Sequence, residues 1–413
     1  MGNLIIENAR VVTPEGLAAR KGKEMGILKE IPDASIIIKE GVIAYVGSMQ
    51  ELPSEFKDSG FRKIDAKGNV ALPGFVDSHT HLVFGGFRPD EFEWRMKGDT
   101  YMSIMERGGG IQSTVNATRI ADKDSLKKKA EWFLHQMSKM GVTTVEAKSG
   151  YGLDYDTEMK MLDVANELAN QDDPFIRIVS TFLGAHAVPK EYKGKTKEYV
   201  DFLIEHLAEF KEKADFCDVF CEKNVFELED SKRLLAVARE AGFKLKLHAD
   251  EIVTLGGGEL SAELKAVSAD HLLHVSDEGI KKMAEAGVVA TLLPLTAFAL
   301  KEPYAPARKF IEAGCAVALA TDLNPGSCFS GSIPLTIALA CIYMNMSIEE
   351  TITALTLNGA AALDMADEIG SIEAGKRGDI VILGSDNYRV LPYYVGMNCV
   401  KTTIFNGKIV SHL

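Results

Sequence analysis

The chain has 413 residues, of which 46% are hydrophobic and 25% charged, which is typical of a globular protein with one large and one smaller domain. Its net charge of −13 argues against nucleic acid and anionic membrane surfaces as partners. We expect no signal peptide and no membrane span, because no apolar run is long enough to cross a bilayer. Six scattered cysteines predict reduced thiols and a cytoplasmic protein.

Both ends of the chain are predicted to form short β-strands. Their segments are rich in β-branched and apolar residues and are punctuated by Gly and Asp. Asn406-Gly407 is a strong hairpin signal near the C-terminal end. We therefore expect a small β-sandwich domain assembled from residues 1–65 and 370–413. The predicted strands are residues 4–12, 34–39, 41–46, 378–383 and 402–410.

Residues 66–369 alternate short apolar runs with amphipathic helical stretches. Eight such βα units predict an α/β protein with a (β/α)8 barrel of the TIM type. The connection over residues 82–141 is long, and we expect extra helices and a lid in it. The predicted strands are residues 70–76, 142–147, 176–183, 216–221, 244–247, 267–271, 288–293 and 316–320, and the clearest helices are 124–140, 156–170, 197–213 and 230–241.

The first apolar run ends in His79-Thr80-His81. Alternate side chains of a strand share a face, so both imidazoles point the same way and offer two nitrogen donors to one metal ion. Alone, this spacing is also compatible with a chance pair of surface histidines. Several other runs end in polar residues as well, and chemistry in such barrels lies at the C-terminal ends of the strands. This alignment favours the metal site.

His248 and Asp322 end the fifth and eighth runs and complete a set of three imidazoles and one carboxylate. This set suits one divalent metal ion, either Zn²⁺ or Fe²⁺, which would lower the pKa of a bound water toward neutrality. Asp322 is predicted to accept the proton of that water, and His271 to orient the water or to stabilise charge on the attacked carbon. The structural alternatives are a core histidine at 248, a helix N-cap at 322 and a barrel hydrogen bond at 271.

The run Pro73–His81, the β-rich ends and the segment Gly370–Asp379 resemble the amidohydrolase superfamily. Within it, the resemblance is to the imidazolonepropionase family of histidine degradation and extends from about residue 2 to residue 410. The His-x-His pair is shared by many families, whereas Lys-Ser-Gly-Tyr-Gly and Asp-Leu-Asn-Pro-Gly-Ser are much more specific. The segments that carry the resemblance are residues 84–88, 107–111, 148–153, 182–189, 248–251 and 321–327.

The resemblance implies hydrolysis of 4-imidazolone-5-propanoate (imidazolonepropionate) to N-formimidoyl-L-glutamate, with water opening a cyclic amide, and it implies a homodimer. Arg88 would pair with the propionate of the substrate, since a guanidinium suits a carboxylate. Glu251 would hold a ring nitrogen and move protons to the leaving group. The implied metal ligands are His79, His81, His248 and Asp322, and the other implied substrate contacts are Tyr151, His186, Asn324, Gly326 and Ser327.

Other activities of the same set of residues stay open. Some barrel hydrolases carbamylate a strand-end lysine to bridge two metals, but four ligands suffice for one metal, so we expect Lys148 to be unmodified. A deaminase of purines or pyrimidines would also use His248, Glu251 and Asp322, although a neutral base needs no carboxylate clamp such as Arg88. A non-catalytic binding protein on the same scaffold is the third alternative.

Overall fold

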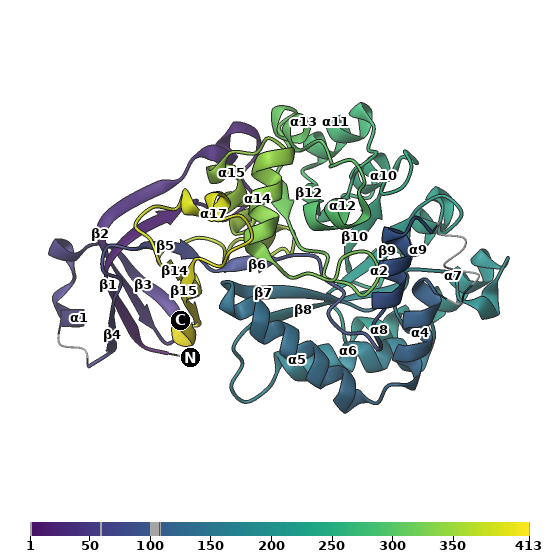
Figure 1. Ribbon diagram of the computed structural model, residues 1–413, viewed down its shortest axis with the longest axis horizontal. Helices are drawn as coiled ribbons and strands as arrows, with labels where there is room; N and C mark the ends of the chain where they lie inside the picture. Colours follow the sequence, from purple (N-terminus) through teal and green to yellow (C-terminus); the bar gives the residue numbers. More distant parts are fainter. Residues whose placement is uncertain (1, 58–59, 100–106, 108, 413) are drawn as a thin grey trace.

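The computed structural model describes residues 2–57, 60–99, 107 and 109–412 of the chain. They form a barrel and, beside it, a sheet built from both chain ends; in Figure 1 this sheet lies on the left and the barrel on the right. The two ends of the chain meet, and Gly2 N donates a hydrogen bond to Asn406 O. Among the described residues, no helix is both long and apolar enough to cross a membrane.

The barrel is an eight-stranded sheet in which sequential strands are neighbours and all pairs are parallel. Nearly every strand side chain is buried, as expected for a parallel sheet covered by helices. Hydrogen bonds from Asp322 N to His79 O and from His81 N to Leu323 O close it. The eightfold prediction is confirmed. The strands are β6 (Phe75–Asp77), β7 (Val142–Lys148), β8 (Arg177–Ala185), β9 (Phe216–Cys221), β10 (Lys244–Ala249), β11 (Ser268–His271), β12 (Val289–Leu292) and β13 (Val317–Leu319).

Helices cover the barrel and match the predicted amphipathic stretches, with one difference. The stretch 197–213 is two helices, because the backbone leaves the helical region at His206. The helices after β7 are α6 (Tyr155–Ala169), α7 (Thr196–Glu205), α8 (Leu207–Lys211), α9 (Leu228–Glu240), α10 (Gly257–Glu263), α11 (Asp277–Ala286), α12 (Pro294–Leu300), α13 (Ala307–Glu312), α14 (Ile333–Tyr343), α15 (Ile348–Ala354), α16 (Leu357–Ala361) and α17 (Val390–Tyr393), with a 3-10 turn η3 (Lys190–Tyr192).

The long connection between β6 and β7 contains the expected extra helices. They are α2 (Pro89–Met96), α4 (Ile111–Ile120) and α5 (Lys123–Lys139), which Asp122 caps by accepting a hydrogen bond from Ser125 N. Residues 100–106 and 108 lie outside the described residues. The predicted lid over the site therefore stays a prediction.

The terminal strands form a β-domain built from both chain ends, as predicted, but the described strands make one mixed sheet and not the two sheets of the predicted sandwich. The first strand pairs antiparallel with the second and parallel with the fourth and fifth. The predicted hairpin is confirmed, with φ of 47° at Asn406 and 73° at Gly407. The elements are β1 (Leu4–Thr13), η1 (Gly22–Gly26), β2 (Lys29–Lys39), β3 (Val42–Ser48), η2 (Met49–Glu51), α1 (Ser54–Lys57), β4 (Arg62–Asp65), β5 (Val70–Pro73), β14 (Ile380–Leu383), β15 (Val400–Phe405) and β16 (Lys408–His412).

The predicted first barrel strand, residues 70–76, was wrong as a single element. Its first part, β5, pairs with β1 and β14 in the terminal sheet, and only Phe75–Asp77 belongs to the barrel. The chain crosses between the sheets at Gly74, whose N–H donates to Asp379 O and where Thr143 leaves no room for a Cβ. The division of the chain into two domains at residue 66 stays a prediction, but β5 lies with the terminal strands.

Candidate metal centre and active site

Four side chains converge at the C-terminal ends of the barrel strands. His79 and His81 follow β6, His248 lies in β10 and Asp322 follows β13. His79 Nε2 lies 3.5 Å and His81 Nε2 3.6 Å from Asp322 Oδ1. His81 Nε2 also lies 3.4 Å from His248 Nε2. Two ligands of one tetrahedral Zn²⁺ lie roughly 3.4 Å apart, because each bond is about 2.1 Å long. The spacing therefore fits a single cation.

Two of the facing atoms of this cluster have no hydrogen-bond partner among the described residues. His79 Nε2 and Asp322 Oδ1 are buried and make no hydrogen bond with any residue that the structure describes. Burial raises the pKa of Asp322 to about 7, because an ionised carboxylate without a nearby cation is costly in the interior. A divalent cation at this point would remove that cost. The donor set therefore fits a metal ion.

The three imidazoles of the cluster are neutral donors. Burial lowers the pKa of His79, His81 and His248 well below the ordinary value. His79 Nδ1 lies 2.6 Å from Asp270 Oδ2, in a buried hydrogen bond. A carboxylate at Nδ1 keeps the proton on that atom, which leaves Nε2 free to bind a metal.

Lys148 ends β7 beneath the cluster. Its Nζ lies 2.7 Å from Asp218 Oδ2, 3.1 Å from Glu146 Oε2 and 3.5 Å from Asp270 Oδ2, and all four side chains are fully buried. A carbamate at this lysine would add negative charge beside three carboxylates. The geometry therefore argues against a lysine-bridged metal pair. The ammonium also occupies the space between Glu146 and Asp270, which are otherwise spaced like metal ligands.

His271 and Glu251 lie beside the ligand imidazoles. The ring of His271 is centred 5.3 Å from that of His79 and 5.1 Å from that of His248, and its Nδ1 lies 3.5 Å from Glu251 Oε1. Burial, and then the charge of Asp322, raises the pKa of Glu251 to about 8, whereas burial lowers the pKa of His271 to about 4. At neutral pH this is a protonated carboxyl next to a neutral imidazole, a pair able to transfer a proton.

His186 and Tyr151 form an aromatic wall beside His81. The ring of His186 stacks on that of His81 at 4.8 Å and 13°, and Tyr151 is centred 5.2 Å from His186. His186 Nδ1 lies 3.0 Å from Gly150 O. Gly150 has a φ of +108°, and a Cβ there would meet His186 and Leu183 O. Only glycine therefore fits at this turn.

Arg88 precedes α2 and lines a pocket of about 490 Å³, a size typical of small-molecule sites. Its side chain is 9% exposed, and its Nη1 lies 3.4 Å from Glu91 Oε2. Its Nε is buried without a partner among the described residues. Its Nη2 occupies the space that a side chain at Gly326 would take. Ser327 lines the same pocket. A guanidinium with free donor capacity is suited to a carboxylate.

Asn324 shapes the loop that follows β13. Its Nδ2 donates to Asp322 O and Ser327 Oγ, and its Oδ1 accepts from the N–H groups of Gly326 and Ser327, all at 2.8 Å. The amide of Asn324 is thus engaged within the loop, which ties the pocket to Asp322. Contact of Asn324, Gly326 or Ser327 with a substrate stays a prediction.

Three buried acids that position these groups were not predicted from the sequence. Asp270 and Asp218 lie 2.6 and 3.0 Å from the Nδ1 atom of a ligand imidazole. Glu158, on α6, accepts hydrogen bonds from the backbone N–H groups of Gly150, Gly152 and Leu153. An acidic residue inside an apolar strand, or on the apolar face of a helix, is the signal that indicates them, because an unpaired buried carboxylate is costly.

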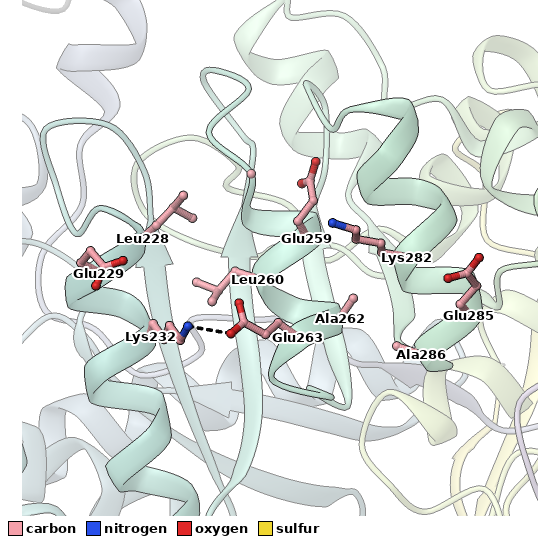
Figure 2. Close-up of a pocket in the computed structure, with 11 residues that line it drawn as sticks. Leu228, Glu229, Lys232, Glu259, Leu260, Ala262, Glu263, Lys282, Glu285 and Ala286 are labelled. Carbon is pink, nitrogen blue, oxygen red and sulfur yellow. Dashed lines mark ion pairs between the residues drawn. The ribbon is translucent and has the colours of Figure 1, made fainter.

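A larger hollow of about 680 Å³ lies on the outer side of the barrel, between α9, α10 and α11 (Figure 2). It is lined by four glutamates and two lysines, and Lys232 Nζ pairs with Glu263 Oε1 at 2.6 Å. None of the described residues that line it is a histidine. The chemistry therefore belongs to the strand-end cluster.

The comparisons with known proteins agree with this geometry. The model of the amidohydrolase family matches residues 70–410. The imidazolonepropionase of Phocaeicola vulgatus is 63% identical over 411 residues, which is 99% of each chain. In fold, the chain resembles E. coli guanine deaminase (TM-score 0.73, 16% identity, 100% of each chain). It also resembles an adenosine deaminase from Xanthomonas campestris with bound zinc (TM-score 0.69, 19% identity, 99% and 92%). The chain therefore belongs to the amidohydrolase family.

Proposed function

We propose that this chain hydrolyses 4-imidazolone-5-propanoate to N-formimidoyl-L-glutamate, the third step of histidine degradation. The observation that carries the proposal is Arg88, whose Nε has no partner among the described residues and which lines the pocket beside Gly326. The loop of this pocket is tied to Asp322 by Asn324. The substrate, an imidazolone ring that carries a propionate, then has its carboxylate at Arg88 and its cyclic amide at the cluster of His79, His81, His248 and Asp322. The imidazolonepropionase of Phocaeicola vulgatus supports the same substrate.

We infer that one divalent cation, Zn²⁺ or Fe²⁺, is held by His79, His81, His248 and Asp322. Three imidazole nitrogens and a carboxylate suit both ions. The similarly folded adenosine deaminase with bound zinc supports Zn²⁺. When bound, the cation supplies Lewis acidity and lowers the pKa of a water that it holds.

Two residues carry the proton transfers, and a third stabilises charge. Asp322, whose Oδ1 faces the ligand imidazoles, accepts a proton from the attacking water as general base. Glu251, with its pKa raised to about 8, holds a proton at neutral pH and donates it to the ring nitrogen that leaves. His271 lies beside the ligand imidazoles, where it orients the water and stabilises charge on the attacked carbon.

The walls of the site bind the rest of the substrate. Arg88 pairs with the propionate, and the hydroxyl of Tyr151 keeps its proton because burial raises its pKa above the ordinary value. His186, stacked on His81, presents a flat face to the imidazolone ring. The remaining proposed contacts come from the loop after β13 and are Asn324, Gly326 and Ser327.

We also propose a cytoplasmic homodimer. All six cysteines are free thiols, which persist in a reducing compartment. Ile342 and Tyr343 of α14 and Tyr393 of α17 are more than half exposed, and the two helices are in contact. Exposed apolar patches of this kind mark interfaces. Light scattering that gives the mass of one chain would contradict the dimer.

An assay with metal analysis tests the activity. We expect freshly prepared imidazolonepropionate to lose its absorbance with the metal-replete protein. Chelation and the His248→Ala substitution should abolish this, and Zn²⁺ or Fe²⁺ should restore activity after chelation. Undiminished turnover by verified metal-free protein would refute the mechanism. Ammonia release from guanine or cytosine would support the deaminase alternative, and binding without conversion would support a binding protein.

Arg88 separates the hydrolase from a deaminase of neutral bases. We expect Arg88→Met to raise KM for imidazolonepropionate about 10- to 100-fold, since a charge-assisted pair contributes about 1.5–3 kcal/mol. An imidazolone that lacks the carboxylate should react equally with both enzymes. Steady-state kinetics on the two substrates measure the difference. An equal rise in KM for both substrates would show that Arg88 does not bind the carboxylate.

A further inference from the structure

Five charged side chains are buried together beneath the ligand cluster, and the proposed reaction uses none of them directly. All are fully buried. Charges persist in a protein interior only when they pair and make hydrogen bonds. A cluster of this kind next to a metal site is therefore expected to have a function. Its members are Glu146, Lys148, Asp218, Lys246 and Asp270.

Lys148 is the common partner of the two carboxylates that lie behind the ligand imidazoles. Its Nζ lies 2.7 Å from Asp218 Oδ2 and 3.5 Å from Asp270 Oδ2. The same two oxygens face the ligands. Asp270 Oδ2 lies 2.6 Å from His79 Nδ1, and these two atoms form a hydrogen bond. Asp218 Oδ2 lies 3.0 Å from His248 Nδ1, but these two atoms do not have the alignment of a hydrogen bond. One ammonium thus connects ligands from two different strands.

The other oxygens of these carboxylates are fixed locally. Asp218 Oδ1 accepts from Val219 N and Asp270 Oδ1 from Ser268 Oγ, both at 2.7 Å. This leaves the Oδ2 atoms to be placed by the lysine and the imidazoles. The negative charges around Lys148 raise its pKa above the ordinary value, although burial alone would lower it, so the ammonium keeps its charge.

We propose that Lys148 is a positioning residue that sets how tightly the site holds its divalent cation. It holds the Asp218 and Asp270 carboxylates against the backs of the ligand imidazoles. Without the ammonium, these carboxylates repel each other and turn away, so that His79 loses the hydrogen bond that fixes its tautomer and His248 loses the negative charge beside its Nδ1. This inference rests on the metal site proposed above.

Zn²⁺ affinity, measured by competition with a chromogenic chelator, tests the proposal. We expect Lys148→Met to raise the dissociation constant for Zn²⁺ about 10- to 100-fold, as for other groups behind metal ligands. The kcat should fall while KM stays within about twofold, because Arg88 is untouched. The visible absorption of Co²⁺-loaded protein should shift, which a general loss of stability would not cause.

Lys376→Met is the matched control. Lys376 is also a buried lysine, 2% exposed, but its Nζ donates to the backbone oxygens of Gly16 and Ala366, outside the site. This variant should lose thermal stability and keep its Zn²⁺ affinity within about twofold. An equal loss of affinity in Lys148→Met and Lys376→Met would overturn the inference, as would an unchanged affinity in Lys148→Met.

A double-variant cycle with Asp218→Asn tests the route through the carboxylate. If part of the effect of Lys148 passes through Asp218, the double variant should lose less Zn²⁺ affinity than the two single variants predict when their free energies are added. The double variant also removes a buried pair as a unit, which is less costly than leaving one charge unpaired, so it can be used if Lys148→Met does not fold. Fully additive free energies would contradict the route through Asp218. Wild-type protein that holds no Zn²⁺ would instead overturn the metal site itself.

Discussion

At position 326 the site has no room for a side chain. A Cβ on Gly326 would overlap Arg88 Nη2, which ends a flexible side chain, so the guanidinium would move rather than the backbone. We expect Gly326→Ala to fold normally and to raise KM for imidazolonepropionate about tenfold, equivalent to about 1.4 kcal/mol of lost ion pairing. The kcat should change little. Steady-state kinetics provide the measurement.

Gly26→Ala is the control for this substitution. A Cβ at Gly26 meets only Glu350 Cγ, at 3.9 Å, which is ordinary van der Waals contact. Both kinetic parameters and the Tm should stay at their wild-type values. An unaltered KM in Gly326→Ala would show that Arg88 does not hold the substrate from its present position.

The ligands and their supporting residues differ in how far the sequence reveals them. His79 and His81 are two apart in one strand, so strand geometry alone places them on one face. Asp322 and His248 were indicated by their places at the ends of apolar runs. Asp270, by contrast, is paired with residues of other strands, and a single sequence does not say which. The metal ligands can be recognised from short segments of the sequence. The pairing of buried charges depends on how the strands come together in the closed barrel.

At the scale of elements, helix α6 holds the loop that carries Tyr151. Glu158 Oε1 accepts from Gly152 N at 2.7 Å and Leu153 N at 2.9 Å, and Oε2 accepts from Gly150 N at 2.9 Å. In Glu158→Gln an NH₂ group must replace one of these acceptors and face a backbone N–H. We expect a loss of about 1–3 kcal/mol in unfolding free energy and a tenfold or greater fall in kcat/KM. Denaturant unfolding and kinetics measure the two.

Glu167→Gln provides the comparison on the same helix. Glu167 is exposed and pairs only with surface lysines, so its removal should change the unfolding free energy by less than about 1 kcal/mol. Hydrogen exchange should locate the effect of Glu158→Gln at the amides of residues 150–153. Exchange there that matches wild type would mean that the loop holds its shape without Glu158.

A strand could be predicted from the sequence where a single sheet buries the whole apolar run. It could not be predicted where the run passes from one sheet to another. β9 coincides with the predicted residues 216–221, because both of its faces are buried in one sheet. Residues 70–76 are equally apolar throughout, but the chain changes sheet at Gly74. Hydropathy records burial and carries no information about which sheet buries the strand, so the run looked continuous.

At the scale of the whole molecule, the barrel and the terminal sheet are joined by buried contacts. Arg177 of β8 pairs with Asp379 at 2.7 Å, with side chains 16% and 4% exposed. Asp379 in turn accepts from Asn406 N at 2.8 Å, and Thr403 Oγ1 donates to Ser138 O at 2.7 Å. These contacts hold the C-terminal strands, and β14 pairs with β5, which pairs with β1. We therefore infer that the barrel and the terminal sheet unfold together.

Cooperative unfolding makes the terminal sheet a reporter of the distant metal site. A cation that binds only the folded state stabilises it by about 4.1 kcal/mol when its concentration is a thousand times the dissociation constant. If the molecule unfolds as one unit, chelation should lower the protection of the slowest amides in β2 and in β9 by the same free energy. Native-state hydrogen exchange with and without chelator measures both. Loss of protection in β9 with none in β2 would show two independent folding units, because a separate terminal sheet gains nothing from metal bound in the barrel.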